Sequence, residues 1–262
     1  MTMPDTALPA QRRAKLVERV RDRGHATVAE LAGDFAVSMD TIRRDLDYLA
    51  DRRLLARTHG GAMRPGELAT ADTTFDSRAA VHHRAKEAIG IAAAQHVADG
   101  ETLIINGGTT TLAVARALST KRDLTVVTNN LRMPAELPVE AVRDLYIIGG
   151  TCRIASNVTV GPIAFPGSEG ISADTAVIGV GGLSPATGLS TTNLPEAQMI
   201  RQMIDACQRV IVVADATKFG RHAFIHICGL ERMSMLVTDA APPDDIARSL
   251  AEAGVEVVVV DP

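Results

Sequence analysis

The 262-residue sequence has no tryptophan, 2 tyrosines, 5 phenylalanines and 3 cysteines. Aromatic residues make up only 3% of it and hydrophobic residues 46%, so we expect a core of Val, Ile, Leu and Ala. Cys152, Cys207 and Cys228 lie far apart and form no C-x-x-C pair. This spacing argues against a structural zinc site and against a disulfide framework.

Long apolar runs are also missing. No run approaches the roughly 18 residues of a membrane-spanning helix. The first segment, MTMPDTALPAQRR, lacks the apolar stretch of a secretory signal. We therefore expect a cytoplasmic protein with no membrane partner.

The formal net charge of the chain is only -4, but its two parts differ. Residues 10–64 contain 12 Lys+Arg and 8 Asp+Glu, a net charge of +4. Residues 65–262 contain 15 Lys+Arg and 22 Asp+Glu, a net charge of -7. A basic N-terminal part on an acidic body indicates a nucleic-acid-binding domain joined to a domain with a different task.

The basic part is expected to hold three short helices. The first places Leu16, Val17 and Val20 on one face and ends at Gly24. The second begins at Thr27, with Glu30 three residues on, which is the spacing of a capping box.

The third helix begins at Ser38 and carries an apolar stripe of Ile42, Leu46 and Leu49. If that stripe faces inward, the other sides present Asp40, Thr41, Arg43, Arg44 and Asp47. A helix of this size fits the major groove of DNA, where arginine can contact guanine or phosphate. The following RRLLARTHGGA is expected to form a two-stranded ribbon with Arg57 and His59 near the phosphate backbone.

The acidic part alternates between strands and helices. Apolar runs predict strands in ETLIIN, LTVVTNN, LYIIGG, TAVIGVGG, RVIVVADA, MLVTD and VEVVVVD. Helical patterns fall at residues 84–97, 110–118, 195–207 and 243–253. Such alternation with continuous apolar strands predicts a mainly parallel sheet that is covered on both faces.

The first of these strands ends in NGGTTT, Asn106 to Thr111. Its glycines allow close approach of a ligand, and Thr109 and Thr110 would place donors at a helix N-terminus, where an anion is favoured. This turn is neither G-K-[ST] nor G-x-G-x-x-G. A phosphate site and a plain capped turn both fit the pattern. Other strands end in polar or glycine clusters, and Lys218 offers a cation at the same sheet edge.

VSMDTIRRDL and LLARTHGGA closely resemble the helix-turn-helix signature of the DeoR family of bacterial transcription regulators. The resemblance continues through NGGTT, VTN, GG, GVGGL and DATKF. It implies an α/β chain with an N-terminal winged helix-turn-helix and a mainly parallel sheet like that of the ribose-5-phosphate isomerase-like sensor fold. We expect a flexible N-terminus at 1–9, the DNA-binding domain at 10–64, a linker at 65–80 and the sensor domain at 81–262.

The resemblance also implies site residues. The predicted DNA-contacting residues are Thr27, Ser38, Met39, Asp40, Thr41, Arg43, Arg44, Arg57 and His59. The predicted effector-contacting residues are Lys86, Asn106, Gly107, Gly108, Thr109, Thr110, Asn129, Gly150, Arg153, Gly182, Glu196 and Lys218. The sequence departs from the family at Asn106, where Asp is common, and GVGG lacks an acidic residue often found there. TNNL, KFGRHAF and TDAAPP look most like the glycerol-3-phosphate regulon repressors.

These features predict a repressor of carbohydrate or glycerol metabolism genes that a phosphorylated metabolite releases from its DNA operator. We expect no cofactor, and a homo-oligomer, either dimer or tetramer, because one such domain reads only a few base pairs. Three alternatives stay open. A sugar-phosphate isomerase would need carboxylates that residues 179–182 cannot supply. A metal sensor would use His222, His226 and Cys228, and a purely architectural DNA binder would leave the large acidic part without a task.

Overall fold

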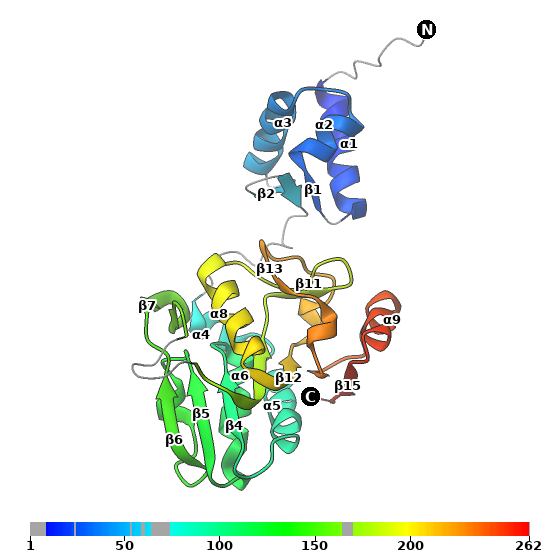
Figure 1. Cartoon of the computed structure of the whole chain (residues 1–262). Helices are drawn as coiled ribbons and strands as arrows, with labels where there is room; N and C mark the ends of the chain where they lie inside the picture. Colours follow the sequence, from blue (N-terminus) through cyan, green and yellow to red (C-terminus); the bar gives the residue numbers. More distant parts are fainter. Residues whose placement is uncertain are drawn as a thin grey trace. The chain divides into compact units, whose positions relative to one another are not determined.

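The computed structural model describes residues 9–23, 25–52, 54–58, 61–63, 74–163 and 170–261. The chain divides into two compact units, Met1–Thr70 and Ala71–Pro262 (Figure 1). Most of the predicted linker and nearly all of the predicted flexible N-terminus lie outside the described residues. No helix in the described ranges is long and apolar enough to cross a membrane.

The first unit, called the DNA-binding domain below, contains three helices and a small sheet among its described residues. Its elements are α1 (Pro9–Arg23), β1 (His25–Thr27), α2 (Val28–Asp34), α3 (Met39–Asp51), β2 (Ala56–Thr58) and β3 (Gly61–Met63). The three predicted helices are confirmed. The predicted ribbon corresponds to β2 and β3, but β1 adds a third antiparallel strand beside β3.

The inward faces predicted for these helices are also confirmed. Leu16, Val20, Ile42 and Leu46 are fully buried, and they pack in one cluster with Leu31. This small aliphatic core holds α3 in place and leaves its opposite faces exposed, so α3 is available to a partner.

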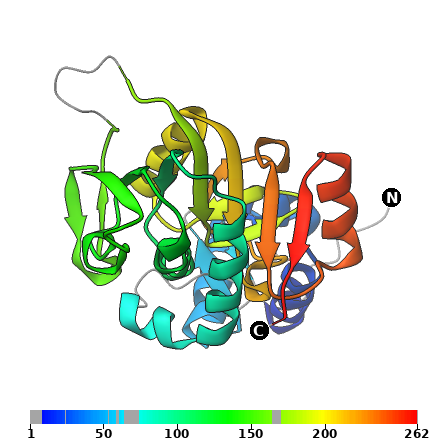
Figure 2. The same cartoon turned by 90° about the horizontal axis from the view of Figure 1, so that it is seen from below.

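The second unit, called the sheet domain below, is built on seven parallel strands. In spatial order they are β15 (Glu256–Val259), β14 (Met235–Thr238), β12 (Cys207–Val213), β9 (Ala173–Gly179), β4 (Thr102–Ile105), β5 (Leu124–Thr128) and β6 (Val142–Ile147). All seven were predicted, and the parallel sheet is confirmed. Figure 2 shows β15 and α9 (red) at one side of this domain and the green strands that follow β4 at the other.

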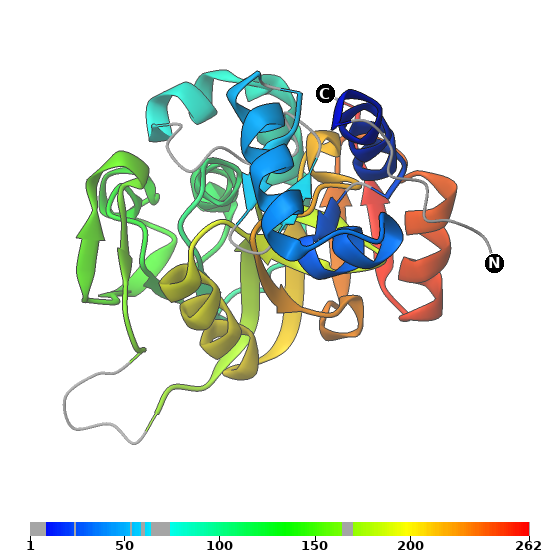
Figure 3. The same cartoon turned by 90° about the horizontal axis from the view of Figure 1, so that it is seen from above.

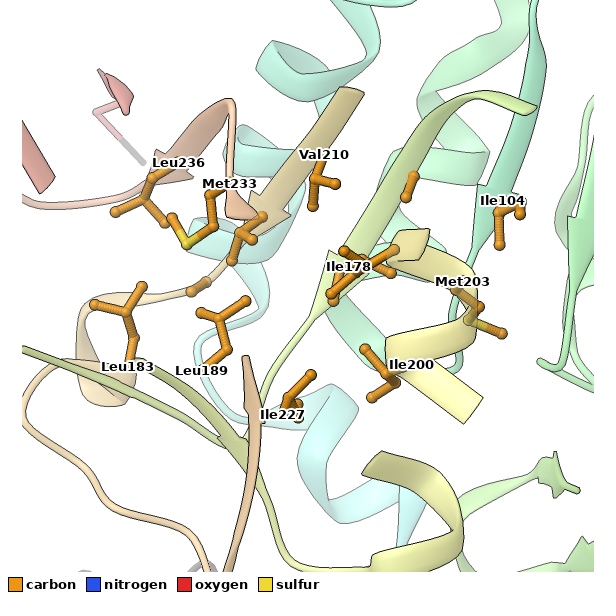
Figure 4. Close-up of a cluster of buried hydrophobic side chains, with 14 of the residues drawn as sticks. Ile104, Ile178, Leu183, Leu189, Ile200, Met203, Val210, Ile227, Met233 and Leu236 are labelled. Atoms are coloured by element: carbon orange, nitrogen blue, oxygen red, sulfur yellow. The ribbon is translucent and has the colours of Figure 1, made fainter. Parts of the chain in front are cut away.

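Helices cover both faces of the sheet. They are α4 (Phe75–Ala80), α5 (His83–Gln95), α6 (Thr109–Arg116), α7 (Met133–Glu136), α8 (Leu194–Asp205) and α9 (Asp244–Glu252). Along β4, Leu103 and Ile105 pack with α5 and α6 on one face, whereas Ile104 packs with α8 on the other. Figure 3 shows α5 and α8 on opposite sides of the strands, and Figure 4 shows the α8 side, where Ile200 and Met203 meet Ile178.

Short elements complete the domain. They are the hairpin β7 (Thr151–Arg153) and β8 (Val158–Val160), the antiparallel sheet of β10 (Gly182–Ser184), β11 (Gly188–Thr191) and β13 (Ile225–Cys228), and the 3-10 turns η1 (Ala117–Thr120), η2 (Ile154–Ser156), η3 (Ala216–Lys218) and η4 (Leu230–Arg232). These strands were not predicted, because three or four residues are too few to show a period.

The predicted linker, residues 65–80, extends too far. Residues 75–80 form α4, and Phe75 is 2% exposed within the core below α5 and α6. Arg132 lies over the Phe75 ring and pairs with Asp76 at 2.7 Å. Residues 75–80 therefore belong to the sheet domain.

Candidate functional site

The N-terminus of α3 is fixed by local hydrogen bonds. The Ser38 Oγ accepts the Thr41 N–H at 3.2 Å, and the Ser38 and Thr41 hydroxyls lie 2.9 Å apart. This confirms the predicted cap. A capped first turn keeps the residues that follow in helical geometry, with Met39 49% exposed at its start.

The two arginines predicted for DNA contact differ in their surroundings. Arg43 donates to Asp40 at 2.7 Å, so its charge is partly neutralised on the helix surface. Arg44 is exposed and forms no ion pair within the part of the chain that the structure describes. Arg44 is therefore the arginine of this pair that is better placed to meet an anion or a guanine edge.

Of three further predicted contacts, one caps a helix and two have side chains outside the described residues. Thr27 and Glu30 form the expected capping box, in which the Thr27 Oγ1 accepts the Glu30 N–H and the Glu30 carboxylate accepts the Thr27 N–H. Arg57 lies on β2, but its side chain is outside the described residues, as is all of His59.

An ion-pair cluster that the sequence analysis missed joins α1 to α3. Asp45 is 2% exposed and accepts from Arg12 Nε at 2.6 Å and from Arg13 Nε at 2.7 Å. The helical pattern predicts outer positions for Asp40 and Asp47 and makes no prediction for Asp45. No local signal reveals this cluster, because the partners stand 32 and 33 residues apart.

In the sheet domain, the strand order reverses between β4 and β9. The chain runs from β4 to β5 and β6 on one side, then returns to β9 and continues through β12, β14 and β15 on the other. Ligands of open parallel sheets bind at such a point, beyond the carboxyl ends of the strands. The turn after β4 therefore occupies the favoured position for a ligand.

This turn leaves the N-terminus of α6 open. Gly108 is its N-cap residue, and no side chain caps the helix there. Thr109, the first helical residue, is half-buried, and Thr110 is 8% exposed. The first-turn N–H groups and the helix dipole together favour an anion.

Gly107 is required by packing. A Cβ atom at this position would lie 2.1 Å from Val158 Cγ1 on β8. The same residue donates its N–H to Asn129 Oδ1 at 2.7 Å. The β7–β8 hairpin therefore sits directly against the turn and fixes its shape.

The side chains of two predicted ligand contacts form hydrogen bonds with neighbouring backbone. Asn106 Oδ1 accepts the Gly179 N–H at 2.8 Å, and Asn106 Nδ2 donates to the Gly179 carbonyl at 2.9 Å, which joins β4 to β9. Asn129 Nδ2 donates to the Thr159 carbonyl at 2.7 Å. The departure at Asn106 has a local reason, since an ionised Asp would have no donor for that carbonyl.

Two more predicted contacts are glycines at close backbone crossings. Gly150 has φ +128°, and a Cβ atom there would lie 2.5 Å from the Val160 carbonyl oxygen. A Cβ atom at Gly182 would lie 2.3 Å from the Arg221 carbonyl oxygen. These glycines allow close backbone packing, and their contact with a ligand stays a prediction.

Lys86 is 7% exposed, and it contacts the C-terminal end of α4, where its Nζ donates to the carbonyls of Arg78 and Val81. Burial lowers the pKa of Lys86, while nearby Asp215 opposes this shift. Burial likewise lowers the pKa of Lys218, again against the influence of Asp215. The structure thus brings the two predicted lysines into electrostatic reach of the same carboxylate.

Glu196 completes this charged group. Its Oε2 accepts from the Thr191 hydroxyl at 2.8 Å, and burial raises its pKa against the opposing influence of Thr191, Arg78 and Arg153. Arg78 was missed because residues 75–80 were read as a linker. Burial lowers its pKa, and its Nε is buried without a hydrogen-bond partner among the described residues.

A small cleft of about 110 Å³ opens beside Thr109, between three helices. Its walls are formed by Phe75, Ala79, His83, Lys86, Glu87, Thr109, Leu112, Ala113 and Arg116. Its lining combines apolar side chains with charged side chains of both signs and includes Thr109, the first residue of α6.

The metal-sensor alternative gains no support. His222 Nδ1 lies 3.1 Å from the Ser184 hydroxyl and 3.0 Å from that of Thr187, and His226 Nδ1 lies 2.8 Å from the Thr187 carbonyl. Burial raises the pKa of Cys228 to about 11, which disfavours the thiolate that binds zinc. Among the described residues no group of three potential ligands comes together.

Comparison with known proteins identifies both domains. The DeoR-like helix-turn-helix domain matches residues 12–67, and the DeoR C-terminal sensor domain matches residues 81–240. The chain is 34% identical to the HTH-type transcriptional regulator GlpR of Haloferax volcanii, over 96% of this chain and 98% of that protein. It is 32% identical to the glycerol-3-phosphate regulon repressor of Escherichia coli, over 92% and 95%.

Among solved structures, a ribose-5-phosphate isomerase in complex with phospho-erythronic acid matches 53% of this chain and 55% of its own, with a TM-score of 0.39 and 14% identity. This likeness is too distant to inform on function. The two domain matches and the full-length relatives decide the matter: the chain belongs to the DeoR family of transcriptional repressors and is a regulator, not an enzyme.

Proposed function

We propose that this repressor leaves its DNA operator when a phosphorylated metabolite binds at the open N-terminus of α6. The observation that carries the proposal is the uncapped first turn of α6 at the reversal point of the sheet. A phosphate there would accept hydrogen bonds from the backbone N–H groups of Thr109 and Thr110. The helix dipole would also stabilise its negative charge.

The charged group that includes Lys86, which lines the same cleft as Thr109, supports a ligand with both phosphate and hydroxyl groups. Lys86, Lys218, Arg78 and Arg153 supply positive charge, and the Glu196 carboxylate is an acceptor for hydroxyl groups. Burial lowers the pKa of Lys86, Lys218 and Arg78 and raises the pKa of Glu196, because burial disfavours the charged forms. A ligand that bridged these groups would add hydrogen bonds and opposite charge to them.

The names of the relatives suggest the class of genes. Two of the matched proteins are a glycerol-3-phosphate regulon repressor and a regulator named GlpR, and a third is a putative aga operon repressor. We infer control of carbohydrate or glycerol metabolism genes, with a sugar phosphate or glycerol 3-phosphate as effector and no cofactor. A dimer or tetramer would bind the operator, because two linked DNA-binding domains contact more base pairs and bind with higher affinity and specificity than one.

Thermal unfolding with a panel of sugar phosphates and glycerol 3-phosphate tests the effector site. A compound present at 100 times its Kd stabilises the protein by about 2.7 kcal/mol, and it should also release bound DNA. Thr109→Val removes the Thr109 hydroxyl as a donor to the phosphate but keeps the backbone N–H, so it should lose part of this stabilisation, while Thr120→Val, at an exposed position of η1, should keep all of it. A normal shift and a normal release with Thr109→Val would place the phosphate elsewhere.

A further inference from the structure

One face of α3 carries polar and basic side chains along its whole length. Thr41, Arg44, Tyr48 and Arg52 follow one another at spacings of three and four residues, so they lie in one stripe. Arg52 is the C-cap residue, so the stripe runs from the first turn of the helix to its end. The buried side chains Ile42, Leu46 and Leu49 fill a different face.

At the C-terminal end of this stripe, two guanidinium groups crowd one aromatic ring. The Cζ of Arg13, from α1, lies 3.8 Å from the centre of the Tyr48 ring, and the Cζ of Arg52 lies 3.7 Å from it. Tyr48 is 37% exposed, the Arg13 side chain is 27% exposed, and Arg52 is exposed. We call Arg13, Tyr48 and Arg52 the arginine–tyrosine stack.

The stack holds more positive than negative charge. Both cations lie within 3.8 Å of one ring centre, so they are closer than the Debye length of about 8 Å at physiological salt and repel each other. Asp45 neutralises part of this charge, but it is already shared between Arg12 and Arg13. Two guanidinium groups therefore share one buried carboxylate, and Arg52 adds a further positive charge on the Tyr48 ring.

An aromatic ring can hold such cations without using their hydrogen bonds. A guanidinium group that stacks on a ring keeps its N–H groups directed outward in its own plane, where they match a phosphate in bidentate fashion. Arg13 uses Nε for Asp45, so its outer amino groups are left for other acceptors. Tyr48 thus orders two long side chains that would otherwise lose rotamer freedom on binding.

We propose that the arginine–tyrosine stack is a contact site for the DNA phosphate backbone, at the far end of α3 from its base-reading turn. Arg13 and Arg52 contact phosphates, and Tyr48 is a positioning residue that holds them. A phosphate supplies the negative charge that the stack lacks, and it is present at every step of a duplex. The contact is independent of base sequence, and it fixes the position of α3 along the groove.

Random-sequence DNA of about 30 base pairs tests this directly, because a phosphate contact needs no operator. The full-length protein is titrated with it between about 50 and 200 mM salt. Arg52→Gln should weaken binding several-fold and lower the slope of log K against log salt by about 1. Tyr48→Leu should do the same or more, since it releases both arginines, whereas Tyr48→Phe keeps the ring and should bind as the parent does.

Arg143→Gln in the sheet domain removes the same charge from an exposed residue and is the matched control, with no expected change in slope. The substituted residues are exposed, and circular dichroism confirms that the variants fold. If Arg52→Gln and Tyr48→Leu keep the parent's affinity and slope, the stack is only a structural contact and the proposal fails. A loss restricted to one selected sequence would also overturn it, because it would place Arg52 on a base edge. Absence of DNA binding by the parent would instead contradict the DNA-binding function itself.

Discussion

The two domains satisfy their polar groups over different distances along the chain. In the DNA-binding domain, Thr27 pairs with Glu30, Ser38 with Thr41, and Asp40 with Arg43. In the sheet domain, the turn after β4 depends on partners that are remote in sequence. Asn106 holds Gly179, which is 73 residues away, and Asn129 holds Thr159, which is 30 residues away.

This difference has a consequence for how each domain tolerates change. A local cap can be lost with a modest cost to one helix end, about 1 kcal/mol. A remote contact joins two strands or a hairpin to the sheet, so its loss alters a site built from several segments. Asp45, held by α1 from 32 residues away, is the exception in the DNA-binding domain.

The largest effect is expected at that exception. Asp45→Ala leaves two arginines beside each other without their carboxylate and should destabilise the DNA-binding domain by about 3 kcal/mol. The sheet domain should be unaffected. The chain has two tyrosines and no tryptophan. In a Tyr146→Phe protein, the tyrosine fluorescence therefore comes from Tyr48 alone, and its change in urea measures unfolding of the DNA-binding domain. Equal unfolding midpoints with and without Asp45→Ala would show that the ion pairs of Asp45 with Arg12 and Arg13 do not stabilise the domain.

The second test concerns the turn in the sheet domain. Gly107→Ala would press its methyl group against Val158 and should cost about 2 kcal/mol. Tyr146 fluorescence in a Tyr48→Phe protein measures this cost. Adding Val158→Ala should recover part of the loss because it makes room for the new methyl group. A failure of this rescue would mean that the hairpin does not determine the shape of the turn.

The third test separates binding from stability in the DNA-binding domain. Arg44→Ala should weaken binding to a duplex selected from a random pool about tenfold, because a bidentate arginine–guanine contact contributes about 1–3 kcal/mol. Thermal unfolding should not change, since Arg44 is exposed. An unchanged gel shift at matched salt would argue against α3 as the recognition helix.

The smallest effect is a pH dependence in the sheet domain. Burial raises the pKa of Glu196 above its ordinary value of 4.5, so the folded protein holds this proton more tightly than the unfolded chain does. The stabilising contribution is present below about pH 4.5 and is lost as pH rises through the folded pKa. Glu196→Gln should remove this dependence, as measured by urea unfolding between pH 4 and 8. Parallel curves for the two proteins would contradict a raised pKa.

Local patterns made much of the fold predictable. The capping box at Thr27, the cap at Ser38 and the stripe of Ile42, Leu46 and Leu49 each lie within one or two turns of helix, so their geometry follows from spacing alone. The seven strands of the parallel sheet were predicted as well, because short continuous apolar runs flanked by glycine and polar residues are typical of strands. The turn at residues 106–111 was placed at a sheet edge for the same reason.

The contents of the site were less predictable. The contacts of Asn106, Asn129, Gly150 and Gly182 with neighbouring backbone were not predicted, and their contact with a ligand stays a prediction. Arg78 was assigned to a linker, although α4 carries it into electrostatic reach of Glu196. In each case the deciding partner lies far along the chain, beyond the reach of any local pattern.

By itself, the sequence determined the helices of the DNA-binding domain, the seven parallel strands and the family, because short-range periodicity and dense motifs specify them. The tertiary structure decided which polar groups are already satisfied and which are left for a partner. That outcome depends on burial and on contacts between distant segments, such as Asp45 with Arg13 and Lys86 with the carbonyls of α4. Only folding brings these groups together, since desolvation and hydrogen bonding act on neighbours in space.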